Sequence, residues 1–174
     1  MEPPPRDPSD VVVVMGVSGA GKSTVGRVLA ERRGVDFVEG DLLHPPENVA
    51  RMAAGVPLTD AEREPWLDAI VEVVDEHRRQ GRPVVVACSA LRRRHRERLR
   101  TCGPLRFALL EVPHDVLRER VADREHAFMP ASLLDDQLAT LEPPSAEEED
   151  VVVVTAREAV SETVDAVEAA LGEA

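Results

Sequence analysis

The chain is predicted to fold as an α/β protein of three layers, with a five-stranded parallel sheet flanked by helices on both faces. Five short apolar runs, several of them rich in valine, have the length and composition of buried strands. Amphipathic stretches separate these runs, so that strands and helices alternate along the chain. A glycine-rich turn follows the first run directly, as expected where a strand leads into a helix.

Each element can be placed from its pattern. The predicted strands are Val11–Met15, Asp36–Glu39, Pro83–Cys88, Leu105–Val112 and Asp150–Thr155. The predicted helices are Thr24–Arg33, Glu47–Ala54, Ala61–Gln80, Arg92–Arg100, Asp115–Asp123, Pro130–Leu141 and Arg157–Leu171. In the first helix Val25, Val28 and Leu29 fall on one side, and Gly172 is expected to end the last helix.

The composition indicates one domain over residues 11–174, after a disordered leader at residues 1–10. A net charge of −12 argues against nonspecific binding to nucleic acid or to a membrane surface. The N-terminus lacks the pattern of a signal peptide, and no apolar stretch approaches transmembrane length. Cys88 and Cys102 form no disulfide framework, so a reduced, cytoplasmic protein is expected.

Lys22 is the only lysine among twenty arginines, and it lies in a segment of the form G-x-x-x-x-G-K-[ST]. A compact ammonium can fold over a phosphate chain, whereas a planar guanidinium fits that space badly. Backbone N–H groups and a helix N-terminus hold anionic phosphates in such a loop. We therefore predict a nucleotide site in which Lys22 contacts the β- and γ-phosphates, Ser23 ligates Mg²⁺ and Thr24 assists. Its residues are Gly16, Val17, Ser18, Gly19, Ala20, Gly21, Lys22, Ser23 and Thr24.

Polar residues follow the ends of the second and third strands, where ligands gather in parallel sheets. Asp41 follows the second strand, and its carboxylate can accept the proton of an attacking hydroxyl or hold that hydroxyl in line. The competing interpretation of Asp41 is a helix cap or turn former. His44 and Ser89 are further candidates for substrate contact, whereas Cys88 is expected to be packed and inert rather than a nucleophile.

Arg120 and Arg124 are four residues apart, so on a helix they share a face. Two guanidinium groups on one face suit a mobile lid that closes over a triphosphate and stabilises developing charge. Most such pairs are solvated surface residues, and the phosphate loop is what favours the lid.

The segment from Arg92 to Arg100 carries the densest positive charge of the chain. A nucleic-acid patch is disfavoured by the acidity of the chain and by the lack of interleaved aromatic residues. Most of this segment is expected to be a solvated amphipathic helix, with Arg92 best placed to receive an anionic substrate. The acidic run at residues 147–150 is likewise expected to be a solvated loop.

Taken together, these motifs resemble the small P-loop gluconokinases over nearly the whole chain after residue 10. The segments that carry the resemblance are residues 16–24, 40–48, 55–60, 63–67, 88–91 and 129–142, and Trp66, the only tryptophan, lies in one of them.

The resemblance implies a P-loop kinase domain with a fold like those of shikimate and adenylate kinases and a lid at about residues 118–137. It implies ATP-dependent phosphorylation of D-gluconate to 6-phospho-D-gluconate by a homodimer. By motif correspondence Lys22 and Ser23 carry phosphate and metal, Asp41 orients the acceptor hydroxyl, and Arg120 and Arg124 act in the lid. The implied substrate-side residues are His44, Arg63, Ser89 and Arg92; a structural salt bridge is the alternative for Arg63.

Several positions depart from the family pattern. His126 and Ala127 stand where a glycine and a histidine are usual, and Asp136 replaces a serine before the glutamine. Arg92 and His95 stand where lysine and tyrosine are usual. Loss of a glycine stiffens a lid or shifts its hinge. These changes leave two alternatives open: a kinase for another sugar acid or polyol, and a nucleotide-binding relative without turnover.

Overall fold

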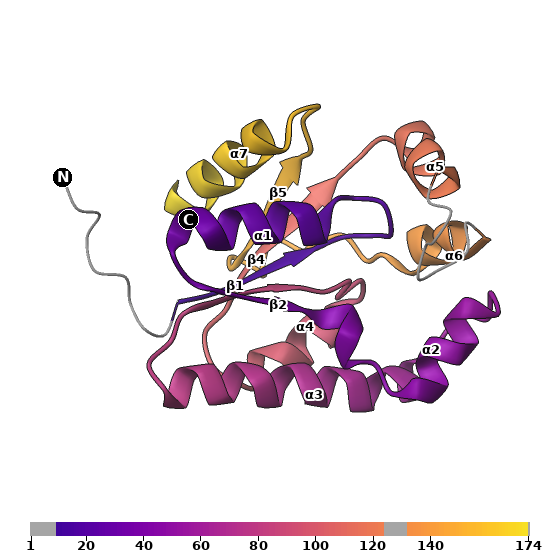
Figure 1. Cartoon of the computed structure of the whole chain (residues 1–174), viewed down its shortest axis with the longest axis horizontal. Coiled ribbons are helices and arrows are strands. Elements are labelled where there is room, and N and C mark those ends of the chain that lie inside the picture. Colours follow the sequence, from indigo (N-terminus) through magenta and orange to yellow (C-terminus); the bar gives the residue numbers. More distant parts are fainter. Residues whose placement is uncertain (1–9, 124–131, 174) are drawn as a thin grey trace.

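A five-stranded parallel sheet forms the middle layer of residues 10–123 and 132–173, the part of the chain that the computed structural model describes (Figure 1). The strands lie in the order β2-β3-β1-β4-β5, and every neighbouring pair is parallel. Their bounds are β1 (Val11–Met15), β2 (Asp36–Glu39), β3 (Val84–Ala87), β4 (Arg106–Glu111) and β5 (Val151–Thr155). The predicted five-stranded parallel sheet is confirmed.

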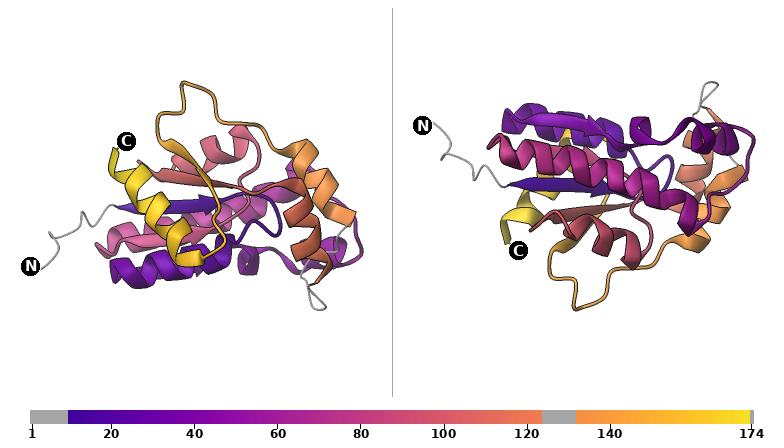
Figure 2. Two further views of the ribbon diagram at one scale, coloured as in Figure 1. Left: turned by 90° about the horizontal axis from the view of Figure 1, so that it is seen from above. Right: turned by 90° about the horizontal axis from the view of Figure 1, so that it is seen from below.

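Helices cover both faces of this sheet, as Figures 1 and 2 show. The helices α1 (Lys22–Arg33) and α7 (Val160–Glu173) lie on one face, and α3 (Asp60–Arg79) and α4 (Arg93–Arg100) lie on the other. Three further helices, α2 (Pro46–Ala53), α5 (His114–Ala122) and α6 (Ser132–Thr140), lie beyond the carboxyl ends of the strands. No helix within the described ranges is long and apolar enough to span a bilayer.

The alternation of side chains along β1 builds both halves of the core. Val12 and Val14 belong to the apolar cluster that α1 and α7 cover. Val11, Val13 and Met15 point to the opposite face and pack in the cluster that α3 covers. All five side chains are buried because successive residues of a strand face opposite sides of a sheet that is covered on both sides.

The two outer strands are less buried than the sequence predicts. In β2 the four residues are exposed or half-buried, and in β5 only Val154 is buried. Each of these strands has one sheet neighbour instead of two, so its outer edge and part of its faces reach solvent.

Several element boundaries differ from the prediction. A short 3₁₀ helix, η1 (Gly40–Leu43), continues from β2 where the sequence predicts only a strand end. The last helix begins at Val160 rather than Arg157, because the N–H of Arg157 is bonded to Oγ1 of Thr163. It also continues through Gly172, since this glycine does not adopt the left-handed conformation that ends α1 at Gly34.

Candidate active site

The phosphate-binding segment turns tightly between β1 and α1. Gly19 and Gly21 have φ angles of 82° and 93°, which side chains other than glycine rarely adopt. A Cβ at Gly19 would lie 3.0 Å from Cγ2 of Val121 on α5, so glycine also permits close packing there. The helix begins at Lys22, two residues earlier than predicted, so its first turn forms part of the loop.

Lys22 folds back over this loop, with Nζ donating a hydrogen bond to the carbonyl of Val17 at 2.9 Å. Its side chain lines a cavity together with Ser23 and Thr24 from the same helical turn. The lone lysine is therefore placed beside the backbone N–H groups and the helix N-terminus, where an anionic ligand is favoured.

Asp41 lines the same cavity from η1, and its backbone is held tightly in place. The preceding Gly40 has no room for a side chain, because a Cβ there would overlap the carbonyl oxygen of Ala87 and lie 2.9 Å from Cβ of Cys88. The carbonyl of Gly40 also accepts a hydrogen bond from Nε1 of the buried Trp66 at 2.8 Å. The position of Asp41 thus depends on contacts from β3 and α3.

His44 stacks on Trp66, with ring centroids 4.4 Å apart and an interplanar angle of 10°. Burial lowers the pKa of His44 to about 4; Asp41 opposes this shift and Arg63 adds to it. The imidazole is therefore neutral at physiological pH and contributes hydrogen bonding rather than charge to the cavity wall.

The first turn of α3 brings Arg63 to the cavity. The helix starts with a capping box, in which Oγ1 of Thr59 accepts from the N–H of Glu62 at 3.2 Å and the Glu62 carboxylate accepts from the N–H of Thr59 at 2.7 Å. Burial lowers the pKa of Arg63. Its buried Nε finds no hydrogen-bond partner within residues 10–123 and 132–173. A cationic group of this kind is suited to an anionic ligand.

Ser89 reaches the cavity, whereas Arg92 does not line it. The guanidinium of Arg92 lies 3.4 Å from the carboxylate of Asp60, which also holds Nε2 of the buried His95 at 3.1 Å. Nδ1 of His95 in turn accepts from the N–H of Arg92 at 3.2 Å. Two of the departures from the family pattern, Arg92 and His95, are therefore joined through one carboxylate of α3.

One face of α6 forms a further wall, made by Leu133, Asp136, Gln137 and Thr140. These positions have the spacing of a single helix face. Oε1 of Gln137 accepts a hydrogen bond from the N–H of Ser18 at 2.6 Å, which ties α6 to the phosphate-binding segment. Gln137 is not among the site residues predicted from the sequence. The signal that could have identified it is the spacing of positions 133, 136, 137 and 140, which places them on one face of a helix.

Arg120, the first of the predicted lid arginines, contacts the phosphate-binding segment from α5. Its Nη1 donates to the carbonyl of Gly19 at 3.2 Å. Arg124, His126 and Ala127 lie outside the described residues, so the expected arginine pair stays a prediction.

Cys88 is fully buried at the end of β3 and makes no disulfide. Burial raises the pKa of its thiol to about 12, which keeps it protonated and unreactive. The expected packing of Cys88 is confirmed.

One cavity thus gathers most of the candidate residues. It is lined by Ser18, Gly19, Gly21, Lys22, Ser23, Thr24, Asp41, His44, Arg63 and Ser89. Among the described candidates, Gly16, Val17, Ala20, Arg92 and Arg120 lie outside that lining. Groups that can hold phosphate, an acceptor hydroxyl and an anion share one space.

Comparison with known proteins identifies the family. A gluconokinase of Gluconobacter oxydans is 50% identical over 138 residues, which cover 79% of this chain and 78% of that protein. This chain belongs to the gluconokinase family. The resemblance inferred from the motifs is thereby confirmed, and membership makes the protein a phosphotransferase.

Solved structures agree with this placement in the gluconokinase family. The crystal structure of a gluconokinase from Sinorhizobium meliloti 1021 is 46% identical, with a TM-score of 0.85 over 97% of this chain and 94% of that chain. A shikimate kinase from Bacteroides thetaiotaomicron, 18% identical, has a TM-score of 0.64 over 94% of this chain and 98% of that chain, a likeness of fold alone. A family model described as an AAA domain matches residues 11–144.

Two expectations about charged segments of this gluconokinase-family chain are wrong in part. Arg96, expected on a solvated helix, is buried, and Glu148, expected in a solvated loop, is buried beside it. Their side chains form an ion pair with an Nη2–Oε1 distance of 2.7 Å. Glu147 and Glu149 are exposed, as expected. Charge runs alone do not reveal a partner 52 residues away along the chain.

Proposed function

We propose that this protein transfers the γ-phosphoryl group of ATP to the terminal hydroxyl of D-gluconate, giving 6-phospho-D-gluconate. The observation that carries the proposal is the convergence of Lys22, Asp41 and Arg63 on one cavity in a member of the gluconokinase family. These three groups match the three needs of the reaction, namely phosphate binding, orientation of a hydroxyl and binding of a carboxylate.

The phosphate-binding segment would hold the nucleotide. Backbone N–H groups at the start of α1 favour negative charge, and Lys22 would contact the β- and γ-phosphates. Arg120 lies 3.2 Å from the carbonyl of Gly19, so a small movement of its side chain would bring it to the phosphates. We assign Arg124 the same role through the motif that it shares with Arg120.

The donor chemistry of the first turn of α1 fits a magnesium ion. The hydroxyl of Ser23 lines the cavity, and oxygen is the ligand that Mg²⁺ takes, commonly from one or two protein groups plus substrate phosphates. Ser23 would hold the ion together with the nucleotide. When bound, Mg²⁺ offsets the negative charge of the phosphates.

Asp41 would orient the acceptor. In the transfer step the acceptor oxygen bonds to the γ-phosphorus, the bond from that phosphorus to the β–γ bridging oxygen breaks, and the hydroxyl proton passes to the carboxylate of Asp41. The hydrogen bond from Trp66 to Gly40 and the lack of space at Gly40 hold the backbone from which this carboxylate extends. Such positioning accounts for much of the rate in phosphoryl transfer.

Arg63 supports an anionic acceptor. Its buried Nε lacks a hydrogen-bond partner among the described residues, and a substrate carboxylate would supply one. The neutral His44 and the hydroxyl of Ser89 line the same cavity and can hydrogen-bond sugar hydroxyls. Arg92 would add positive charge nearby without direct contact.

A panel of acceptors tests this assignment. We expect steady-state ADP formation with ATP and Mg²⁺ to have the highest kcat/KM for D-gluconate, compared with its stereoisomers, other sugar acids and the uncharged polyol sorbitol. The Arg63→Met variant should lose much of the preference for gluconate over sorbitol. Equal turnover of gluconate and the other acids would point to a different sugar acid, and ATP binding without any acceptor-dependent ADP release would point to a protein without turnover.

We also infer a homodimer in a reducing, cytoplasmic setting. The free, buried Cys88 and Cys102 and the net charge of −12 support a reducing compartment away from nucleic acid and membranes. Family resemblance supports the dimer. Light scattering coupled to gel filtration distinguishes a mass near 38 kDa from the 19.0 kDa of one chain.

A further inference from the structure

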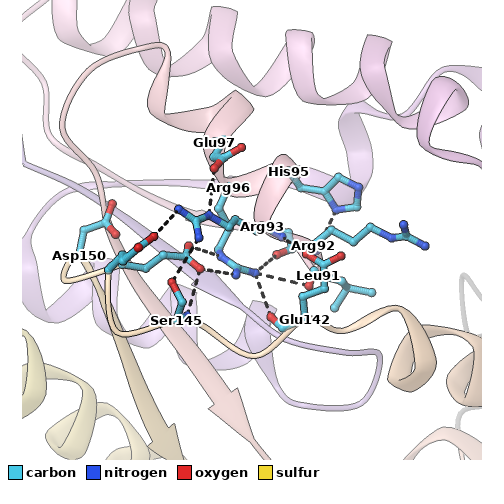
Figure 3. Close-up of polar contacts among 12 residues, drawn as sticks. Leu91, Arg92, Arg93, His95, Arg96, Glu97, Glu142, Ser145 and Asp150 are labelled. Atoms are coloured by element: carbon cyan, nitrogen blue, oxygen red, sulfur yellow. Dashed lines mark hydrogen bonds and ion pairs between the residues drawn. The ribbon is translucent and has the colours of Figure 1, made fainter.

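Arg96 is a buried cation at the centre of a network that connects three segments of the chain (Figure 3). Its Nε and Nη2 donate to the carboxylate of Glu148 at 2.8 and 2.7 Å. The pKa of Glu148 falls to about 2, chiefly through the hydrogen bond from Arg96, so the carboxylate stays ionised. Arg100 joins the same carboxylate at 2.8 Å and binds Asp150 as well.

The third nitrogen of the Arg96 guanidinium, Nη1, donates to backbone carbonyls rather than to side chains. Nη1 donates to the carbonyls of Ala90, Leu91 and Glu142, at distances of 3.3 to 3.4 Å. The N–H of Glu142 also donates to the carbonyl of Leu91 at 2.8 Å. One guanidinium thereby fastens the turn after β3 to the chain that leaves α6, and Figure 3 shows Leu91 and Glu142 on the same side of Arg96.

The turn that Arg96 holds is strained and leads directly into the cavity. Ala90 has a φ of 39°, the one positive φ of a residue other than glycine in the described ranges. Such backbone persists only where its surroundings impose it, and it is common near functional sites. The residue before it is Ser89, whose side chain lines the cavity, and the segment that follows leads to Arg92.

Stability alone does not account for this arrangement. Replacing a buried ion pair with apolar side chains of similar volume is often neutral or stabilising, because two charges must be taken out of water. What an apolar pair cannot supply is a donor to three backbone carbonyls. The pair therefore supplies a geometric constraint that apolar side chains would lack.

We propose that Arg96, held by Glu148, is a positioning residue that fixes the Ser89–Ala90–Leu91 turn and through it the acceptor side of the active site. The proposal rests on the phosphorylation of gluconate proposed above, since it concerns the same cavity. Arg96 touches neither substrate nor nucleotide in this role; it acts through the backbone that carries Ser89.

Three variants separate positioning from folding. Arg96→Lys keeps a positive charge against Glu148. The ammonium of lysine lacks the planar guanidinium that donates to three carbonyls as well as to Glu148. The double variant Arg96→Met, Glu148→Met removes both buried charges together, so it avoids an unpaired charge. Arg98→Lys is the matched control: Arg98 lies on the same helix and is paired with Asp68, but it makes no bond to residues 89–91 among the described contacts.

We expect the KM for gluconate to rise at least about tenfold in Arg96→Lys and in the double variant, with the KM for ATP changing less than about threefold. The double variant should stay folded with a lower melting temperature, because it avoids an unpaired buried charge but leaves the carbonyls of Ala90 and Glu142 without their donor. Hydrogen exchange of the amides at residues 89–92 should be faster in both, whereas Arg98→Lys should match the wild type in every measurement.

A double variant with the wild-type KM for gluconate, measured where the protein is folded, would overturn the proposal and leave the pair a structural one, whatever its melting temperature. An equal rise of KM in Arg98→Lys would do the same, because the effect would then belong to the helix as a whole. If the double variant does not fold, Arg96→Lys decides by the same criterion. A wild type that does not turn over gluconate contradicts the proposed function instead, and hydrogen exchange then still tests the turn.

Discussion

The N–H of Ser18 donates a hydrogen bond to Oε1 of Gln137 across 2.6 Å, although 119 positions separate the two residues in the chain. This bond connects the phosphate-binding segment to α6, the helix that contributes a whole face to the cavity wall. Leu133 on the same helix packs with Met52 and Leu58, so α6 also contacts the acceptor side. Gln137 is a neutral group in this place, and it tethers the loop without adding a charge that would repel phosphate.

Replacing Gln137 with methionine should therefore slow the reaction while leaving the fold intact. Methionine has a similar length but no amide oxygen to accept from Ser18. We expect kcat to fall about tenfold, with a change in melting temperature of less than about 4 °C, since one part-buried hydrogen bond contributes about 1 kcal/mol. Gln80→Met, at the far end of α3, is the matched control and should leave kcat unchanged. A Gln137→Met enzyme with wild-type kcat would show that the bond is dispensable.

Trp66 should be needed for the position of Asp41 as well as for stability. Trp66→Phe keeps an aromatic ring against His44 but removes the Nε1–H that donates to the carbonyl of Gly40. An unpaired buried acceptor costs about 1–3 kcal/mol, so urea unfolding should show a loss of that size. The displaced 3₁₀ helix should also reduce kcat. Loss of stability with unchanged kcat at a temperature where the variant is folded would limit Trp66 to a packing role.

The neutral state of His44 makes stability depend on pH. The pKa of His44 is about 4 in the folded protein, below its ordinary value of 6.5, so between these values the unfolded chain binds the proton more tightly. The free energy of unfolding should therefore fall as pH decreases from about 6.5 to about 4. Burial also lowers the pKa of His95, which acts in the same direction. His44→Gln should flatten this slope without abolishing it, and an equally steep slope in urea titrations of the variant would contradict the assignment.

Lys22→Arg tests whether shape, and not charge alone, is required at the phosphate-binding segment. The wider guanidinium cannot fold over the loop as the ammonium of Lys22 does when it reaches the carbonyl of Val17. We expect kcat/KM for ATP to fall on the order of a hundredfold, with the melting temperature little changed. An unimpaired variant would mean that the lone lysine of the chain has no special role.

Much of the fold could be predicted from the sequence because its signals are local. The valine-rich runs and the amphipathic stretches between them place every strand within one or two residues. The missed 3₁₀ helix at Gly40–Leu43 depends on packing against β3 and on the hydrogen bond from Trp66, neither of which is visible in a run of four residues. The continuation of α7 through Gly172 likewise depends on a backbone conformation that glycine permits but does not require.

The candidate site likewise contains some residues that the sequence reveals and others that it does not. The loop that leads to Lys22 and the turn that carries Asp41 each follow a strand directly, so the rule that ligands gather at the carboxyl ends of parallel strands is enough to bring them together. Gln137 and Arg96 could not be found in this manner, because their partners Ser18 and Glu148 come from distant parts of the chain. Arg92 is expected at the substrate; in the structure its guanidinium lies 3.4 Å from Asp60 and the residue does not line the cavity.

The most direct test of the central claim is gluconate-dependent ADP formation, measured side by side for the wild type and Asp41→Asn, with ATP binding measured on the same samples. We expect the wild type to release ADP in step with the formation of 6-phosphogluconate. Asp41→Asn should bind ATP normally but turn over at least about a hundredfold more slowly, because it lacks the carboxylate that receives the hydroxyl proton. A wild type that releases no ADP with gluconate, or an Asp41→Asn variant with near-normal turnover, would contradict the account.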